Sequence, residues 1–270
     1  MKILELFGGI GACSKALERL GINYEIADYV EIDKYAVASF NAIHNTNFEP
    51  QDVCKWNKDI EVDLIMHGSP CQDFSLAGKQ LGGDENSGTR SSLMYETLRI
   101  VEKLKPKYVI WENVKNVISK KHKHNFDNYC NKMSELGYRN YAQVLNAKDY
   151  GIPQNRERVF TISIRKDIEK DFQFPPKQEL KLKLKDMLED NVDQSFYLTE
   201  KQIEQISYWK SYRQPIAEAL ERERESTPTI TAKSNTSLNA SMILLKENIT
   251  CNGIKKDNLK INVEHGMENM

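Results

Sequence analysis

The sequence contains no long hydrophobic run. Across its 270 residues, nothing approaches the ~18 consecutive apolar residues that a membrane-spanning helix needs. Met1 and Lys2 lead straight into the apolar stretch Ile3–Phe7, without the layout of a signal peptide. We therefore expect a cytoplasmic protein without a membrane anchor.

Cysteine is scarce and scattered. The chain has five cysteines, an odd number, and no Cys-x-x-Cys spacing occurs among Cys13, Cys54, Cys71, Cys130 and Cys251. This distribution predicts neither a disulfide framework nor a zinc site. We expect reduced thiols and no bound metal.

A large excess of charge of one sign is also absent. The 38 basic and 39 acidic side chains give a formal net charge of −1, so the overall charge does not indicate a polyanionic partner. The local exception is Lys103–Lys123, which contains seven lysines and has Glu112 as its only acidic residue. Such a run is usually a solvated face, and it is also compatible with a rim that faces phosphates.

The last absence is the third glycine of a dinucleotide-binding pattern. Lys2–Phe7 reads as a buried strand, Gly8–Gly11 follows as a glycine turn, and Ala12–Leu20 has the pattern of a helix. This succession is typical of nucleotide-binding sites, because glycine lets the backbone approach a ligand. Since Ser14 stands in place of the third glycine, an ordinary pyrophosphate site is not expected.

Two acidic residues follow at predicted strand ends. Tyr24–Val30 reads as a second strand, and Glu31 at its end lies 20 residues after Gly11, the spacing at which a carboxylate reaches a ribose diol. Gln51–Val53 reads as a further polar strand end, from which Asp52 could contact a purine amino group. An exposed loop aspartate is an equally good interpretation of Asp52.

A thiol lies where a predicted strand passes into a loop. The run Asp63–Met66 reads as a strand, and Gly68–Ser75 follows as a tight loop that contains Cys71. Pro70 fixes its own φ and disfavours the helical region for Ser69, so the chain leaves the strand in a defined direction. A buried structural cysteine is the ordinary alternative. The polar loop favours a functional role, because open α/β sheets bind ligands at the carboxyl ends of their strands.

A glutamate marks the next predicted strand end. After the glycine-rich segment Gly78–Thr89, which reads as a functional loop, Ser91–Leu104 has helical spacing. Tyr108–Trp111 reads as the following strand, with Glu112 at its carboxyl end. A capping or surface acid is the simplest interpretation of this glutamate. Its place at the same predicted sheet edge as Cys71 favours a shared site.

Two arginines lie close together near the last predicted strands, Tyr141–Leu145 and Arg158–Ile164. Arg156 and Arg158 alternate, so in an extended chain they would point to one side. Two guanidinium groups on one side suit a phosphate or a base edge. A solvated strand face paired with Glu157 is the alternative.

The order of these segments predicts an α/β fold with a doubly wound, mostly parallel, Rossmann-like sheet. The character of the sequence changes after Arg165. We expect residues 1–166 to form the ligand-binding catalytic domain and residues 167–270 a smaller region, with a loosely ordered tail from Lys246 onward.

Five segments, in order, resemble the motifs of the C5-cytosine-specific DNA methyltransferase family: Phe7–Ala12, Glu31–Asp33, Gly68–Ser75, Glu112–Val114 and Gln154–Arg158. The resemblance covers the chain from Met1 to about Arg165. Any one of these motifs occurs by chance, but five in register make the similarity specific.

The resemblance implies a DNA (cytosine-5-)-methyltransferase that uses S-adenosylmethionine. The thiolate of Cys71 would add to C6 of cytosine, so that C5 can attack the sulfonium methyl group. Glu112 would contact N3 and the exocyclic amine, and Arg158, with Arg156 as a further catalytic residue, would support the addition. Glu31 would hold the ribose and Asp52 the adenine, in a cofactor site of Phe7, Gly9, Ile10, Gly11, Glu31, Ile32, Asp52, Val53, Ser69, Pro70 and Leu93.

The implied substrate is double-stranded DNA, whose target base must be flipped out of the stack, in a restriction–modification setting. Three alternatives stay open. An RNA cytosine-C5 methyltransferase would share nearly every catalytic residue, a nicotinamide enzyme on a similar sheet would not need Cys71, and a DNA-binding remnant would bind without methyl transfer.

The end of the sequence departs from the family pattern. Thr227–Ala232 resembles the start of a target-recognition region, but nothing after it matches the family's closing motifs. The resemblance therefore predicts a small, incomplete C-terminal recognition lobe. It also predicts a separately encoded partner segment that completes the fold.

Overall fold

The computed structural model describes residues 1–70, 83–84, 87–168 and 170–187, with short segments at 220–221, 226–228, 242–244 and 261–263. The helices are α1 (Ala12–Arg19), α2 (Lys34–His44), α3 (Met94–Leu104) and α4 (Lys123–Glu135). The longer strands are β1 (Lys2–Leu6), β2 (Glu25–Val30), β3 (Leu64–His67), β4 (Tyr108–Val114), β5 (Tyr138–Asn146) and β7 (Glu157–Arg165). The short strands are β6 (Gln154–Asn155), β8 (Leu220–Glu221), β9 (Thr227–Pro228), β10 (Met242–Leu244) and β11 (Ile261–Val263).

The chain divides into two compact units. The first unit comprises Met1–Leu145 and Glu157–Pro175, and the second comprises Asn146–Arg156 and Pro176–Met270. The assignment of residues 1–166 to catalysis and of residues 167–270 to target recognition stays a prediction.

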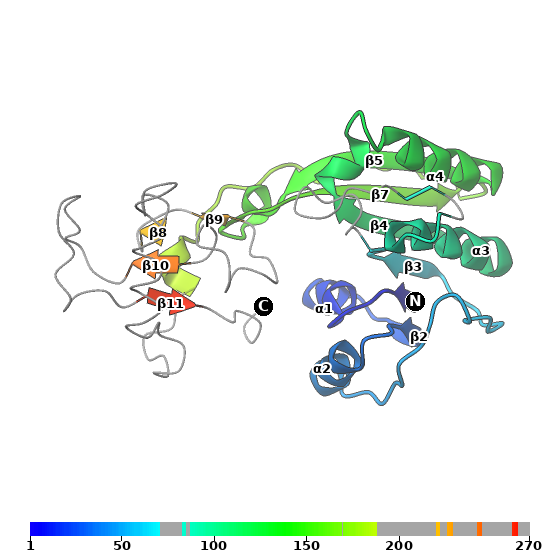
Figure 1. Ribbon diagram of the computed structural model, residues 1–270, viewed down its shortest axis with the longest axis horizontal. Coiled ribbons are helices and arrows are strands. Elements are labelled where there is room, and N and C mark those ends of the chain that lie inside the picture. Colours follow the sequence, from blue (N-terminus) through cyan, green and yellow to red (C-terminus); the bar gives the residue numbers. More distant parts are fainter. Residues whose placement is uncertain are drawn as a thin grey trace. The chain divides into compact units, whose positions relative to one another are not determined.

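A six-stranded sheet in the order β2-β1-β3-β4-β7-β5 organises the first unit (Figure 1). β1 pairs in parallel with β2 and β3, and β3 pairs in parallel with β4. β7 pairs antiparallel with β4, from Tyr108↔Ile164 to Val114↔Arg158. Because the strand order runs outward from β1 in both directions, the sheet is doubly wound. The predicted α/β class and mostly parallel sheet are confirmed.

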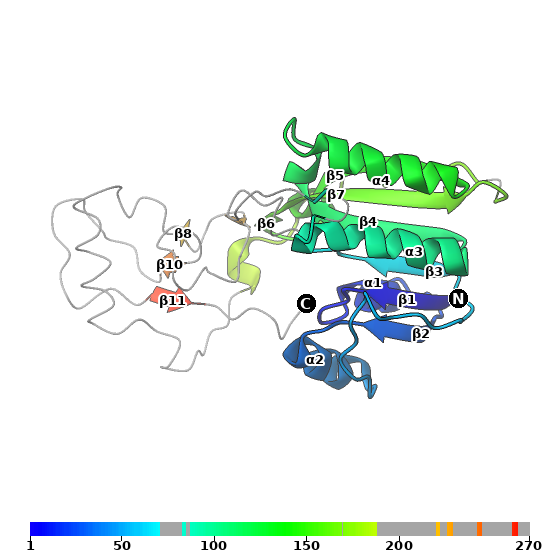
Figure 2. The same ribbon diagram turned by 45° about the vertical axis from the view of Figure 1, so that its right-hand side comes forward.

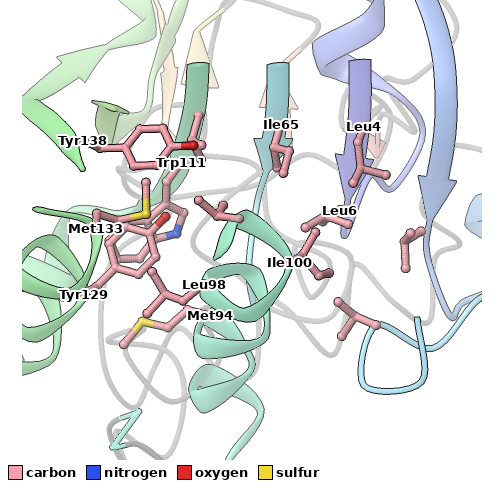
Figure 3. Packing of buried hydrophobic residues seen from close by; sticks show 14 of the residues in the cluster. Leu4, Leu6, Ile65, Met94, Leu98, Ile100, Trp111, Tyr129, Met133 and Tyr138 are labelled. Atoms are coloured by element: carbon pink, nitrogen blue, oxygen red, sulfur yellow. The ribbon is translucent and has the colours of Figure 1, made fainter. Parts of the chain in front are cut away.

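One face of the sheet carries the largest apolar cluster. Leu4 and Leu6 of β1, Ile65 of β3 and Trp111 of β4 belong to it and are at most 1% exposed. They pack with side chains of α3 and α4, which contact each other along this face (Figure 2). Figure 3 shows the helical members of the cluster: Met94, Leu98, Ile100, Tyr129 and Met133.

The opposite face of the sheet is covered by α1 and α2. Successive side chains of a strand point to opposite sides, so the strands also present apolar side chains to this face. Leu64 and Met66 of β3 pack with Leu17 of α1. Tyr29 of β2 stacks on Phe40 of α2, with ring centroids 3.8 Å apart. Helices therefore cover both faces, and the polar edge of the sheet is left to its loops.

The second unit contains short strand pairs among its described residues. β6 pairs in parallel with β9, and β10 pairs antiparallel with β11 and in parallel with β8. β11 lies within the tail that follows Lys246, and its alternating β-branched residues favour a strand. The expected loose order of the rest of this tail concerns residues outside the described ones.

The expected strand end at Gln51–Val53 is wrong. These residues lie in an irregular segment between α2 and β3, where the amides of Lys55 and Trp56 both donate to the Asp52 carbonyl at 3.0 Å. The apolar side chains of this segment, Val53 and Trp56, enter the core cluster. Packing against the core, rather than pairing with a neighbouring strand, therefore determines the local conformation.

Two predicted boundaries also differ from the structure. β4 continues beyond the predicted end at Trp111, because pairing with β7 continues to Val114, and Glu112 lies in the carboxyl-terminal part of the strand as expected. The expected extended run Gln154–Arg158 is broken at Arg156, whose amide donates to the Gln154 carbonyl at 3.0 Å. The longer β4 arises from pairing with a segment that is distant in the sequence, which local patterns do not contain.

The packing of α3 on the sheet can be tested at Ile100, which is fully buried. Ile100→Ala should lower the free energy of unfolding by about 2–5 kcal/mol, because apolar transfer energy is lost and a cavity remains. Leu20→Ala is the control, since Leu20 is 72% exposed and its truncation should change stability by less than about 0.5 kcal/mol. Urea denaturation followed by circular dichroism measures both, and equal losses would contradict the burial of Ile100.

Candidate active site

The ends of four parallel strands align at one edge of the sheet. Leu6 of β1 pairs with Val30 of β2 and with His67 of β3, and His67 pairs with Trp111 of β4. The residues that come next are therefore neighbours at this edge: Phe7, Glu31, Gly68 and Glu112. Ligands of open α/β sheets bind at this edge.

The glycine turn after β1 has three residues with positive φ: Phe7 (54°), Gly9 (55°) and Gly11 (85°). For Phe7 this left-handed conformation costs about 1–2 kcal/mol, and such strained residues cluster at functional sites. The amides of Phe7 and Gly8 donate to the Val30 carbonyl at 2.8 and 3.4 Å, which ties the turn to the end of β2. Ile10, half-buried, completes this turn.

The glycines of the turn have different surroundings. A Cβ on Gly11 would lie 2.7 Å from the Phe40 ring, and a Cβ on Gly8 would lie 2.6 Å from the Tyr29 ring. A Cβ on Gly9 would meet nothing within 4 Å. Gly8 and Gly11 are thus required by packing, and Gly9 is the position where a ligand can approach the backbone.

Glu31 holds the turn and the start of α2 together. Its carboxylate accepts hydrogen bonds from the amides of Gly9 (3.2 Å), Ile32 (2.8 Å) and Asp33 (2.9 Å). A carboxylate has about four acceptor sites, so one remains for a further donor such as a ribose hydroxyl. Ile32 is 69% exposed and presents an apolar surface beside this carboxylate.

Asp52 lies next to Glu31, because the Gln51 amide donates to the Glu31 carbonyl at 2.8 Å. The Asp52 side chain accepts from the Cys54 amide at 3.0 Å and is half-buried. Val53 is 5% exposed and belongs to the core cluster. The open space beside Gly9, two carboxylates and an exposed apolar side chain form a set that fits an aminopurine nucleoside.

The backbone that leads to Cys71 is fixed by the core. Ser69 is 3% exposed, and its hydroxyl accepts from the indole N–H of Trp111 at 3.0 Å. The side-chain amide of Asn113 donates from Nδ2 to the Ser69 carbonyl at 3.2 Å. Pro70, half-buried, follows, and Cys71 itself lies outside the described residues.

Glu112 and Arg158 form an ion pair across β4 and β7. Arg158 Nε donates to Glu112 Oε1 at 2.9 Å, and the side chains are 17% and 33% exposed. A Cβ on Gly68 would lie 3.8 Å from Glu112 Oε2, so this carboxylate sits beside the backbone three residues before Cys71. Two of the predicted catalytic residues are therefore in contact.

The other predicted residues have different surroundings. Arg156 belongs to the second unit, in which its carbonyl accepts from the Ala147 amide at 3.0 Å. Leu93 ends a 3₁₀-helical turn before α3 and packs against the core cluster. Glu157, considered as a partner of the arginines, instead forms an ion pair with Lys115 at 3.0 Å.

Sequence patterns did not predict a buried carboxylate under the glycine turn. Glu5 is 1% exposed and accepts hydrogen bonds from both the amide (2.9 Å) and the hydroxyl of Ser14 in the first turn of α1. Burial raises the pKa of Glu5, against the opposing effect of the Ser14 hydrogen bonds. The serine in place of the third glycine was the available signal, because its hydroxyl supplies a partner for this carboxylate.

A buried histidine at the end of β3 was also missed. His67 Nε2 lies 2.9 Å from the Tyr129 hydroxyl and Nδ1 lies 3.4 Å from Thr97 Oγ1, while its ring stacks parallel to Trp111. Burial lowers the pKa of His67 to about 3, so the imidazole is neutral at physiological pH. As an uncharged group, His67 contributes to the packing of β3, the strand that precedes Ser69.

Several lysines of the 103–123 run have partners in the structure. Lys107 pairs with Asp63 at 2.7 Å, Lys123 pairs with Asp127 at 2.6 Å, and Lys103 donates to the Asn57 carbonyl at 2.8 Å. In the described part of the chain, no group of three or more His, Cys, Asp or Glu side chains is arranged to hold a metal ion. No described helix is both long and apolar enough to cross a bilayer.

Comparison with known families gives one match over nearly the whole chain. The sequence profile described as "C-5 cytosine-specific DNA methylase" matches residues 1–265. The chain is 37% identical over 258 residues to the type II methyltransferase M2.ScrFI of Lactococcus lactis subsp. cremoris, covering 75% of this chain and 71% of that protein. It is 39% identical over 194 residues to the type II methyltransferase M.HhaI of Haemophilus parahaemolyticus, covering 70% of this chain and 57% of that enzyme.

Solved structures show the same fold. The chain superposes on a Spodoptera frugiperda DNMT2 mutant with a TM-score of 0.73 and 21% identity, over 91% of this chain and 75% of that one. A putative prophage DNA modification methyltransferase from E. coli gives a TM-score of 0.60 at 26% identity, over 74% of this chain and 58% of that one.

The different surroundings of Gly9 and Gly11 can be tested by two matched substitutions. Gly9→Ala should cost only about 1–2 kcal/mol of stability, since the new methyl group meets open space and only the positive φ opposes it. Gly11→Ala should cost about 1–3 kcal/mol more, because its methyl group collides with α2. Chemical denaturation of both variants measures the difference, and a Gly9→Ala variant less stable than Gly11→Ala would be incompatible with this geometry.

The buried imidazole of His67 should make stability depend on pH. Its pKa is lowered from 6.5 to about 3 on folding, so the unfolded chain takes up a proton that the folded chain does not, and stability is lost as pH falls below 6.5. His67 should account for about 2 kcal/mol of the stability lost between pH 7 and pH 5. Between pH 7 and pH 5, the free energy of unfolding of His67→Gln should fall by about 2 kcal/mol less than that of the wild type in urea titrations. Leu20→Ala should show the pH dependence of the wild type. An unchanged pH slope in His67→Gln would refute the assignment.

Proposed function

The chain belongs to the C-5 cytosine-specific DNA methylase family, and we propose that it transfers a methyl group from S-adenosylmethionine to C5 of cytosine in duplex DNA. The observation that carries this proposal is the Glu112–Arg158 ion pair, which lies beside Gly68 and hence close to the start of the Cys71 loop. The same sheet edge carries the open side of Gly9 and the Glu31 carboxylate.

The methyl donor would supply an electrophilic methyl group on a sulfonium sulfur. Glu31 would accept a ribose hydroxyl at its remaining acceptor site, and Ile32 would cover one face of the adenine. Asp52 would accept a hydrogen bond from the adenine amino group. Gly9 would allow the ligand to lie against the backbone, while Phe7, Ile10, Gly11, Val53, Ser69, Pro70 and Leu93 complete the proposed site.

Cys71 is the proposed nucleophile. Its thiolate adds to C6, and the electrons of the C5–C6 double bond make C5 nucleophilic. C5 then takes the methyl group as the carbon–sulfur bond of the donor breaks. Water would finally take the C5 proton, and the electrons of the C5–H bond would re-form the C5–C6 double bond as the C6–sulfur bond breaks and releases the thiolate. The base must be outside the helix for this, so the proposal includes flipping of the target cytosine.

Glu112 would hold N3 and the exocyclic amine of the flipped base, favouring a protonated N3 as the thiolate adds. Arg158 pairs with the Glu112 carboxylate and would keep its orientation. Arg156 would be a further catalytic residue. Residues 167–270 would read the bases around the target, with a separately encoded segment as part of the proposal.

The described thiols are poor candidates for the nucleophile. Burial raises the pKa of Cys13 and of Cys130 to about 12, and it also raises that of Cys54. Cys13 and Cys130 therefore have almost no thiolate at neutral pH, and the thiolate is the reactive species. This supports the choice of Cys71, which stands in the loop motif that resembles the family.

Replacement of the nucleophile tests the mechanism. Cys71→Ser should lose transfer of tritiated methyl groups to duplex DNA while it still binds S-adenosylmethionine, because a hydroxyl is a far weaker nucleophile than a thiolate. Cys130→Ser is the matched control and should retain transfer. Duplex DNA containing 5-fluorocytosine should form a covalent complex with the wild type and with Cys130→Ser, but not with Cys71→Ser.

Near-normal turnover by Cys71→Ser would refute the covalent mechanism. The same assay with RNA in place of DNA separates the substrate classes. Methyl transfer to RNA alone would overturn the proposal of a DNA substrate while leaving the role of Cys71 intact.

A further inference from the structure

A carboxylate is buried in the apolar layer that lies between the sheet and the 51–62 segment. Asp28 in β2 is 3% exposed. A register shift in the pairing of β1 with β2 matches Ile3 to Ile26 and Leu4 to Asp28, so that Ala27 is the extra residue of a β-bulge. The bulge sets Asp28 opposite Leu4, which belongs to the core cluster. A carboxylate in such a place requires strong partners, because an unpaired buried charge is costly.

Four donors satisfy this carboxylate. Oδ1 accepts from the Tyr29 amide and from Gln51 Nε2, each at 3.0 Å, and Oδ2 accepts from Trp56 Nε1 and Lys58 Nζ, each at 2.7 Å. Burial opposes ionisation of Asp28, but the hydrogen bonds outweigh it and hold the pKa below its ordinary range. Asp28 is therefore a fixed anion with three partners in one short segment of the chain.

The position of these partners is the informative point. Gln51 immediately precedes Asp52, and Trp56 follows it four residues later. Asp28 therefore binds the chain on both sides of Asp52. Gln51 is held further by the Tyr29 carbonyl, to which its side chain donates at 2.7 Å.

Helix α3 holds the same turn from its other side. Arg99 donates to the Val53 carbonyl at 2.9 Å and also pairs with Glu96 at 2.8 Å. The short segment that contains Asp52 is thus held between a β2 carboxylate and an α3 guanidinium. Such support from a second set of residues orients a binding group more accurately than a free loop can.

We propose that Asp28 is a positioning residue that makes the methyl-donor site selective for adenine, by fixing the turn from which Asp52 reads the purine amino group. The inference rests on the proposed function, because it takes the nucleoside at this edge to be that of S-adenosylmethionine. It goes beyond that function, since Asp28 is buried and would act on the site only through its contacts with the segment that contains Asp52.

Base selectivity is the measurement that separates positioning from general stability. S-Adenosylhomocysteine offers an amino group to Asp52, whereas S-inosylhomocysteine offers a carbonyl oxygen there and would be repelled. A hydrogen bond to a charged acceptor corresponds to a preference of roughly 10-fold or more for the adenine ligand. Asp28→Asn introduces a donor where the carboxylate accepted four hydrogen bonds, and should reduce this preference to about 2-fold or less.

The experiment is calorimetric titration of both ligands into the full chain and its variants. Asp63→Asn is the matched control, because Asp63 also accepts from a backbone amide (Lys2, 2.9 Å) and a lysine (Lys107, 2.7 Å), but at the opposite edge of the sheet. It should keep the wild-type preference. In an Asp52→Ala background the preference should already be lost, and adding Asp28→Asn should change it no further.

The possible results are distinct. A wild type that binds neither ligand would overturn the proposed function and this inference with it. A wild type that prefers adenine, with an Asp28→Asn variant that keeps this preference or loses affinity for both ligands equally, would overturn the inference alone. Should Asp28→Asn fail to fold by circular dichroism, Trp56→Phe decides. It removes one donor to Asp28 while keeping an aromatic ring, and an unchanged preference in it would overturn the inference.

Discussion

Parallel pairing of β2, β1, β3 and β4 is the constraint on which the site depends. Because these strands run in one direction, their carboxyl ends meet at one edge, and the alignment of Leu6, Val30, His67 and Trp111 brings the next residues together. Phe7 and Gly68, 61 positions apart in the sequence, thus become neighbours. The helices that connect the strands cover both faces, so polar loops are left for this edge alone.

The loops at this edge are held by buried polar groups of the core. Glu5 holds the start of α1 through Ser14, Asp28 holds the turn around Asp52, and the Trp111 indole holds Ser69. Each buried group is paired, as the cost of an unsatisfied polar atom requires. The same hydrogen bonds that satisfy the buried polar groups also define the conformation of the loops. A site that must bind a nucleoside and a base in fixed orientation gains from such rigid support.

Elements with strong local signals were predictable. β1, α1, β2 and β3 lie within one or two residues of their predicted bounds, because buried strands and amphipathic helices leave clear patterns. The spacing of Glu31 from Gly11 led to the prediction of a ribose contact, which stays a prediction, whereas its hydrogen bond with the Gly9 amide is visible only in the structure. The turn at Asp52 was mistaken for a strand end, because its conformation depends on Asp28 and Arg99, far away in sequence. The strand that carries Glu112 was predicted to end too early, at Trp111, for the same reason, since β7 extends the pairing to Val114.

Sequence alone was sufficient for the fold class and for the identity of the family, because period-2 and helical patterns are local and because five motifs in order are specific. It also indicated which residue types gather at the sheet edge. Only the tertiary structure decided which glycine faces open space, that Glu112 is paired with Arg158, and that Asp28 and His67 are buried. These properties depend on contacts between segments distant in the chain, and no local pattern encodes the distance between two side chains that meet only when the sheet has formed.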